Sequence, residues 1–130
     1  QAQKALAHAT LITRPGGTII LAAACPEGSG SEHYENWMDG KLSYAEVMEQ
    51  FAVEGFRIGP HKAYQIARDA TRINLCFYTD MDAVKAFALL LNPVANLQTV
   101  IDNALTDLPP DELVGILPHA SSTIPYLEIG

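Results

Sequence analysis

The sequence is poor in basic residues and in cysteine, and it has no long apolar run. It contains 8 Lys and Arg against 15 Asp and Glu, so its formal net charge is -7. Nucleic-acid binding depends on clustered Lys and Arg, and this balance therefore argues against a nucleic-acid partner. No apolar stretch approaches the roughly 20 residues that a membrane-spanning helix needs, so we expect no membrane partner either.

Cysteine occurs only at Cys25 and Cys76, each inside an apolar run. Two cysteines at this spacing form neither a disulfide framework nor a zinc site, and free cysteine commonly packs as a small hydrophobe. We therefore expect a reduced, cytoplasmic setting.

The remaining composition is typical of a globular domain. Of the 130 residues, 48% are hydrophobic and 18% are charged. A chain of this length and composition can bury a hydrophobic core without disulfide bonds or structural metal ions. We expect a single domain over residues 1–130. The chain starts at Gln1, without a methionine, in a helical pattern, and we interpret it as the C-terminal part of a longer two-domain protein.

The stretch 16–30, GGTIILAAACPEGSG, predicts a central strand. Its eight small or apolar residues from Thr18 to Cys25 lie between glycine turns, as in a strand buried on both faces of a parallel sheet. Further strands are predicted at 73–79 and 113–117, with a brief extended segment at 92–94. Strands alternating with helices favour a three-layer, Rossmann-like α/β domain, in which a mostly parallel sheet carries helices on both faces.

Helical spacing and capping residues mark the expected helices. The first covers 1–13 and ends at a Pro-Gly-Gly turn, and Pro60 suits the first turn of a helix through Ala70. The expected amino-terminal caps are Ser29 with Glu32, Ser43 with Glu46, Asp80, and Asn96.

The loop after the predicted central strand is the first candidate site. Glu27 and Gly28 lie between a strand end and a helix start, where backbone amides favour an anion. The loop is neither a G-x-G-x-x-G fingerprint nor a Walker loop, so a purely structural turn stays open. A metal site built from Glu27, Glu32, His33 and Glu35 is less consistent with the spacing than a solvated, capped helix end.

Two later segments also carry polar groups. His61 and Lys62, beside Tyr64, could face an acidic substrate, or they could simply start a surface helix. His119, Ser121 and Ser122 follow the last predicted strand. Because the G-x-S-x-G nucleophile elbow is absent, we do not expect hydrolysis, and a hydrogen-bonding loop is the simpler interpretation.

Gln1 and Lys4 would project side by side, one turn apart, on a stripe that continues through His8 and Leu11. An ammonium beside an amide suits a carboxylate and a neighbouring oxygen, because charge-assisted hydrogen bonds are strong. The alternative is two solvated residues.

Five segments, taken in order, resemble the C-terminal domain of the nickel-pincer-dependent lactate racemase family. They are Gln1-x-x-Lys4, Pro15-Gly16-Gly17-Thr18-Ile19-Ile20, Cys25-Pro26-Glu27-Gly28-x-Gly30, Gly59-Pro60-His61-Lys62-Ala63 and Leu117-Pro118-His119-Ala120-Ser121-Ser122-Thr123. Trp37 stands in a different motif from that family's substrate-site tryptophan, so it is no match, and Tyr64 is at best a substitute for it.

The resemblance implies a racemase or epimerase of an α-hydroxy acid, lactate-like or larger. In that family a nickel-pincer nucleotide takes the substrate's α-hydride and returns it, and this cofactor and the acid/base histidines belong to the preceding domain. The C-terminal domain closes the cleft, contacts the substrate through residues that match Gln1 and Lys4, and holds no metal. Its partners would be its own N-terminal domain and a small hydroxy acid, and the fragment alone would be inactive.

Two other classes of function stay open at this point. The chain could be a non-catalytic α/β ligand-binding or regulatory module, or a purely structural or interaction domain. A preceding domain with the family's histidine and lysine positions would favour the enzyme.

Overall fold

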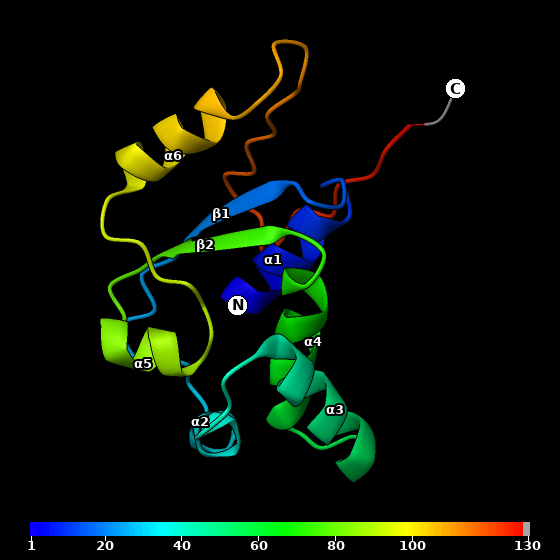
Figure 1. Cartoon of the computed structure of the whole chain (residues 1–130), viewed down its shortest axis with the longest axis vertical. Helices are drawn as coiled ribbons and strands as arrows, with labels where there is room; N and C mark the ends of the chain where they lie inside the picture. Colours follow the sequence, from blue (N-terminus) through cyan, green and yellow to red (C-terminus); the bar gives the residue numbers. More distant parts are fainter. Residues whose placement is uncertain (129–130) are drawn as a thin grey trace.

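The computed structural model describes residues 1–128, which form a mixed α/β domain with a short parallel sheet (Figure 1). The elements in chain order are α1 (Ala2–Thr10), β1 (Thr18–Ala22), α2 (Glu32–Met38), α3 (Tyr44–Glu54), α4 (Pro60–Ala70), β2 (Asn74–Tyr78), α5 (Ala83–Ala88) and α6 (Leu97–Thr106). None of the described helices is long and apolar enough to cross a bilayer.

The sheet pairs β1 with β2 in parallel, in a register that runs from Thr18 opposite Asn74 to Ala22 opposite Tyr78. On the other side of β2, Pro93 forms an isolated parallel bridge with Phe77, which confirms the extended segment predicted at 92–94. The central strand is shorter than predicted, because β1 ends at Ala22 and the chain turns at Cys25 with a φ of 48°.

Each strand follows a helix, and the two helix-to-strand turns are joined. Gly16 N donates to Arg72 O at 2.7 Å, and Asn74 N donates to Gly17 O at 2.8 Å. α1 and α4 also contact each other, and α6 contacts β1. Figure 1 shows α6 on one side of the two strands and α1 and α4 on the other, so helices lie on both sides of the sheet.

The core is formed by the sheet together with residues of helices α1 to α5. Its best-buried side chains include Leu6, Val47, Ala67 and Phe77, of which Val47 is completely inaccessible to solvent. Burial of such side chains contributes roughly 1.5–3 kcal/mol each relative to exposure.

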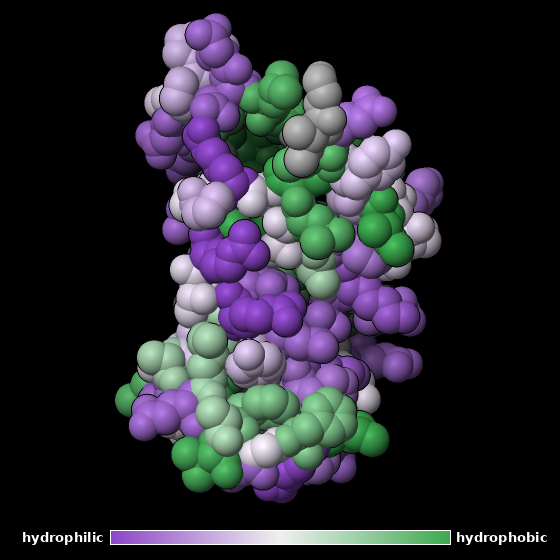
Figure 2. Space-filling view, turned by 90° about the vertical axis from the view of Figure 1, so that its right-hand side faces the viewer, coloured by the Kyte–Doolittle hydropathy of each residue, from purple (hydrophilic) through white to green (hydrophobic). Residues whose placement is uncertain are grey.

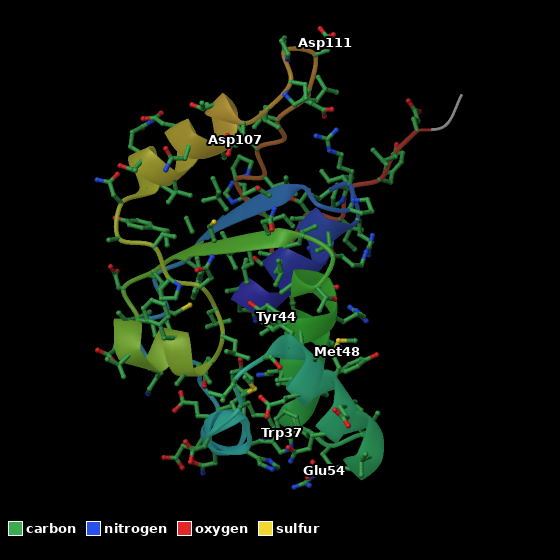
Figure 3. All side chains as sticks on the ribbon, viewed as in Figure 1. Trp37, Tyr44, Met48, Glu54, Asp107 and Asp111 are labelled. Carbon is green, nitrogen blue, oxygen red and sulfur yellow. The ribbon has the colours of Figure 1, made fainter. Side chains whose placement is uncertain are left out.

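α2 and α3 are joined by polar contacts around the Trp37 side chain. Trp37 Nε1 donates to Glu54 Oε2 at 2.7 Å, and Gln50 Nε2 donates to the other oxygen of Glu54 at 3.0 Å. Lys41 Nζ donates to Trp37 O and lies 4.3 Å from the Trp37 ring centre, which adds a cation–π contact. Figure 3 shows Trp37 and Glu54 together at the lower end of the molecule.

Two predicted caps are confirmed and two are wrong. Ser43 and Asn96 accept from backbone amides in the first turns of α3 and α6, and Pro60 begins α4 as expected. The cap of α2 is Ser31 rather than Ser29, because the Ser29 hydroxyl is engaged with Glu35. The cap of α5 is Asp82 rather than Asp80, whose backbone amide instead donates to Ala24 O.

The first helix and the last strand also differ from expectation. α1 ends at Thr10 instead of Thr13, and the next two amides bond carbonyls three residues back. Residues 113–117 form no strand: their backbone makes no sheet hydrogen bond among the described residues, and Leu113 is 94% exposed. Instead, Gly115 of this segment lies against Ile12 in the turn after α1.

Apolar side chains remain exposed at two ends of the molecule. Figure 2 shows apolar atoms at the lower end, where α3 ends in Figure 1, and again at the top around the end of the chain. The exposed residues are Val53 in the last turn of α3, Phe56 and Ile58 after it, and Leu113, Val114, Ile116, Ile124, Tyr126 and Leu127 near the carboxyl terminus. Clusters of this kind are typical of surfaces that meet another domain or protein.

Candidate functional site

One face of α1 carries the first pair of predicted substrate-contact residues. Gln1 is the N-cap residue of α1, but its side chain makes no capping hydrogen bond. Gln1 and Lys4 are both exposed, one turn apart, and His8 follows one turn further on the same face. The ammonium and the amide are therefore accessible to a ligand.

The third turn of α1 is joined to the segment near the carboxyl terminus. His8 Nδ1 lies 2.6 Å from Ala120 O, in a part-buried contact. Since a carbonyl oxygen only accepts, Nδ1 must carry the proton and donate it. This bond places the turn with His119 and Ser121 on the face of α1 that carries Lys4.

That turn is ordered by its own hydrogen bonds and presents polar groups outward. Ser122 N donates to His119 O at 3.0 Å, and Ser122 Oγ donates to the same oxygen at 3.2 Å. His119, Ser121 and Ser122 are all exposed. Among residues 1–128, the Ser121 hydroxyl has no hydrogen-bond partner, so it is available as a donor.

The loop after β1 is organised by Glu35 of α2. Ser29 Oγ donates to Glu35 Oε1 at 2.8 Å, and Ser29 N approaches the same oxygen at 3.4 Å. Lys85 Nζ of α5 lies 3.3 Å from Glu35 Oε2. One carboxylate thus joins the loop after β1, α2, and the helix that follows β2.

Glycine at position 28 permits this close approach. Gly28 has a φ of 72°, and a Cβ there would lie 3.4 Å from both Glu35 Oε1 and Lys85 Nζ. The Glu35 pKa is lowered from its ordinary value of 4.5, first by the Ser29 hydroxyl and then by the Ser29 amide and Lys85. Glu27 is exposed beside this network.

The amino end of α4 holds the next predicted group. His61 Nδ1 accepts from Gly59 N at 3.0 Å, and the His61 ring lies 5.5 Å from Phe56. A Cβ on Gly59 would lie 3.2 Å from the ring of His33 in α2, so the start of α4 and the start of α2 are in contact. Lys62 is part-exposed beside His61.

Tyr64 packs within the helical layer. Its ring stacks on Phe51 of α3, with centroids 4.8 Å apart, and it is only part-exposed. The phenol therefore contributes to the contact between α3 and α4.

The structure joins the predicted groups in two clusters. His119, Ser121 and Ser122 lie against the α1 face of Gln1 and Lys4, while the loop with Glu27 and Gly28 lies against α2 and α5, and α2 in turn meets the start of α4. Among the described residues, no hydrogen bond or ion pair joins the Lys4 side chain to the loop at 25–30.

Two open hollows lie away from both clusters. One, of about 320 Å³, is lined by Leu42, Ser43, Tyr44, Phe87, Leu90 and Asn92, and the other, of about 300 Å³, lies along α3. No predicted site residue lines either hollow. Among residues 1–128, no three His, Cys, Asp or Glu side chains gather where they could hold a metal ion.

No protein-family model matches the sequence, and no curated protein matches it significantly. Among solved structures, the chain is similar to the lactate racemase apoprotein from Thermoanaerobacterium thermosaccharolyticum, with a TM-score of 0.80 and 21% sequence identity over 94% of this chain. The chain has a lactate racemase-like fold. It spans only 30% of that structure's chain, and identity at this level shows the fold alone.

Sequence reasoning missed the two contacts that organise these clusters. Lys85 gave no signal, because a single lysine on a short helix has no distinguishing pattern. His8 was visible on the stripe of Gln1 and Lys4, but its partner is the backbone of Ala120, which no side-chain pattern reveals.

Proposed function

We propose that this chain is the substrate-binding, cleft-closing C-terminal domain of a nickel-pincer-dependent racemase or epimerase that acts on an α-hydroxy acid, lactate-like or larger. The observation that carries the proposal is the likeness to lactate racemase apoprotein, at a TM-score of 0.80 over 94% of this chain. Gln1 and Lys4 stand in the Gln-x-x-Lys pattern and are both exposed, which supports a role in substrate contact.

On this proposal, Lys4 binds the substrate carboxylate and Gln1 donates to a neighbouring oxygen. A charge-assisted hydrogen bond from an ammonium fixes the acid while the bond at its α-carbon is remade. The hydroxyl of Ser121 and the ring of His119, brought to the same face of α1, add donors for a larger or more polar acid.

The nickel-pincer nucleotide would supply hydride abstraction and return, and on this proposal the preceding domain holds it. The described residues of this chain offer no ligand set for nickel. What this chain supplies is substrate binding and one wall of the cleft.

The exposed apolar side chains support a partner domain. Phe56 is 72% exposed and Ile116 is 85% exposed, and an N-terminal domain of the same protein would cover such surfaces. The three-layer, Rossmann-like arrangement belongs to the same proposal, supported by helices on both sides of the sheet. The cytoplasmic setting stays a prediction.

Turnover of a panel of chiral α-hydroxy acids by the full-length gene product, loaded with cofactor, tests the proposal. We expect racemisation or epimerisation of at least one acid, and Lys4→Ala should reduce kcat/KM roughly tenfold to a hundredfold, because it removes a charged hydrogen bond. Gln3→Ala, one residue away on another face of α1, is the matched control and should change little.

Absence of turnover and of nickel uptake in the full-length protein would contradict the proposal. Binding of a hydroxy acid without turnover would instead favour a non-catalytic ligand-binding module. If Lys4→Ala and Gln3→Ala change kcat/KM equally, Lys4 does not contact the substrate.

A further inference from the structure

Residues 112–122, here called the C-terminal strap, contact the turn that follows α1 and then the last turn of α1 itself. Three contacts mark its course in order: Glu112 pairs with Arg14, Gly115 approaches Ile12, and Ala120 O meets His8. The strap therefore passes the turn after α1 first and reaches the last turn of the helix at Ala120.

The three contacts differ in how firmly they hold the strap. The Arg14 and Glu112 side chains are 55% and 30% exposed, and exposed ion pairs contribute little. A Cβ at Gly115 would lie 3.7 Å from Ile12 Cδ1, an ordinary van der Waals contact. The part-buried bond between His8 and Ala120 is thus the principal polar anchor.

His8 sets the strap beside the proposed substrate groups. His8 is four residues after Lys4 on the same face, which is a rise of about 6 Å along the helix axis. The turn at 118–122 is therefore fixed to the residue one helical turn after Lys4 on that face. Without that anchor, the exposed and mostly apolar strap segment at 113–116 has few contacts to keep the turn there.

We infer that His8 is a positioning residue: its Nδ1–H holds the carbonyl of Ala120 and so places the hydroxyl-bearing turn of the strap on the substrate face of α1. The role in substrate binding rests on the proposed function, whereas the anchoring itself does not. The bond persists whether the ring is neutral or protonated, since Nδ1 carries a proton in both states.

Ring ¹⁵N NMR and backbone relaxation of the full-length protein test the anchor. At a pH where His8 is neutral, we expect its proton on Nδ1. His8→Phe keeps a ring but removes the donor, and we expect residues 118–122 to gain fast backbone motion. His8→Asn carries an amide nitrogen at the position of Nδ1 and should restore the order. A neutral ring protonated at Nε2, or an unchanged turn in His8→Phe, would overturn the inference.

Steady-state kinetics test whether the anchor serves the site. With the acid that the wild-type protein turns over, His8→Phe should raise KM about fivefold, the effect of one lost hydrogen bond, with kcat nearly unchanged, and His8→Asn should recover KM. A loosened turn with unchanged KM would overturn the positioning role. Failure of the wild-type protein to turn over any acid refutes the proposed function separately, and NMR still decides whether His8 holds the strap.

Discussion

Glu35 joins three elements through two kinds of contact, and their relative strength can be measured. The Ser29 hydroxyl donates to Glu35 at 2.8 Å, and the Glu35 side chain is only 25% exposed. A hydrogen bond to a charged group contributes about 1.5–3 kcal/mol when well shielded, so about 1–1.5 kcal/mol is reasonable for this part-exposed bond. The Lys85 side chain is 44% exposed, so its ion pair with Glu35 should contribute about 0.5 kcal/mol or less.

Two double-mutant cycles separate these contributions. One combines Glu35→Ala with Ser29→Ala, the other combines Glu35→Ala with Lys85→Ala, and the free energy of unfolding is measured by urea denaturation at pH 7. Each cycle cancels the change in helix propensity at position 35 and leaves the pairwise coupling. We expect the Ser29 coupling to be about twice the Lys85 coupling or more.

The same contacts predict a pH dependence. Because the folded-state pKa of Glu35 lies below its ordinary value of 4.5, its stabilisation is fully present above that value and is lost as pH falls through the folded pKa. The difference in unfolding free energy between wild type and Glu35→Gln should therefore shrink between pH 7 and pH values well below 4.5. A Lys85 coupling larger than the Ser29 coupling, or a difference that does not shrink in acid, would refute this account.

Two further predictions concern the backbone and the core. Gly59→Ala should destabilise the protein by about 2–3 kcal/mol, because φ is 101° and the new Cβ would press on His33 at 3.2 Å, whereas Gly40→Ala, with a φ of 77° and open space, should cost about 1 kcal/mol. If denaturation gives the same loss of stability for Gly59→Ala and Gly40→Ala, the His33 side chain moves aside and the steric argument is wrong. Val47→Ala should cost about 2–3 kcal/mol, since Val47 is fully buried, while Val53→Ala on the exposed face of the same helix should change stability by less than about 0.5 kcal/mol. Similar melting temperatures for the two valine variants would contradict the assigned core.

Local signals in the sequence predicted most of the elements. Apolar runs located β1 and β2, and Pro60, Ser43 and Asn96 marked helix starts that the structure confirms. These signals succeed because capping and strand formation depend on neighbours within a few residues.

Competition between nearby polar groups explains the missed caps. Ser29 and Ser31 both precede α2, and the choice between them depends on Glu35, which takes the Ser29 hydroxyl. Residues 113–117 have the composition of a strand, but the contacts on either side of them lead away from the sheet: Glu112 pairs with Arg14 in the turn after α1, and Ala120 O meets His8. This second outcome depends on contacts that are distant in sequence, and no periodicity encodes them.

The same limit applies to the site. Gln1 and Lys4 were predicted as neighbours from helical spacing, and both are exposed on α1. The approach of His119 and Ser121 to that face depends on one bond to a backbone carbonyl, and side-chain patterns carry no information about it.

The parallel pairing of β1 with β2 also determines when β1 can enter the sheet during synthesis. β1 is synthesised before α2, α3 and α4, and its partner β2 only after them. A nascent chain that ends before Asn74 therefore leaves the apolar β1 unpaired along the edge that β2 later fills, a state prone to wrong association. Because Gly16 N donates to Arg72 O and Gly17 O accepts from Asn74 N, the turn between α1 and β1 acquires these two hydrogen bonds only after α4 has been made.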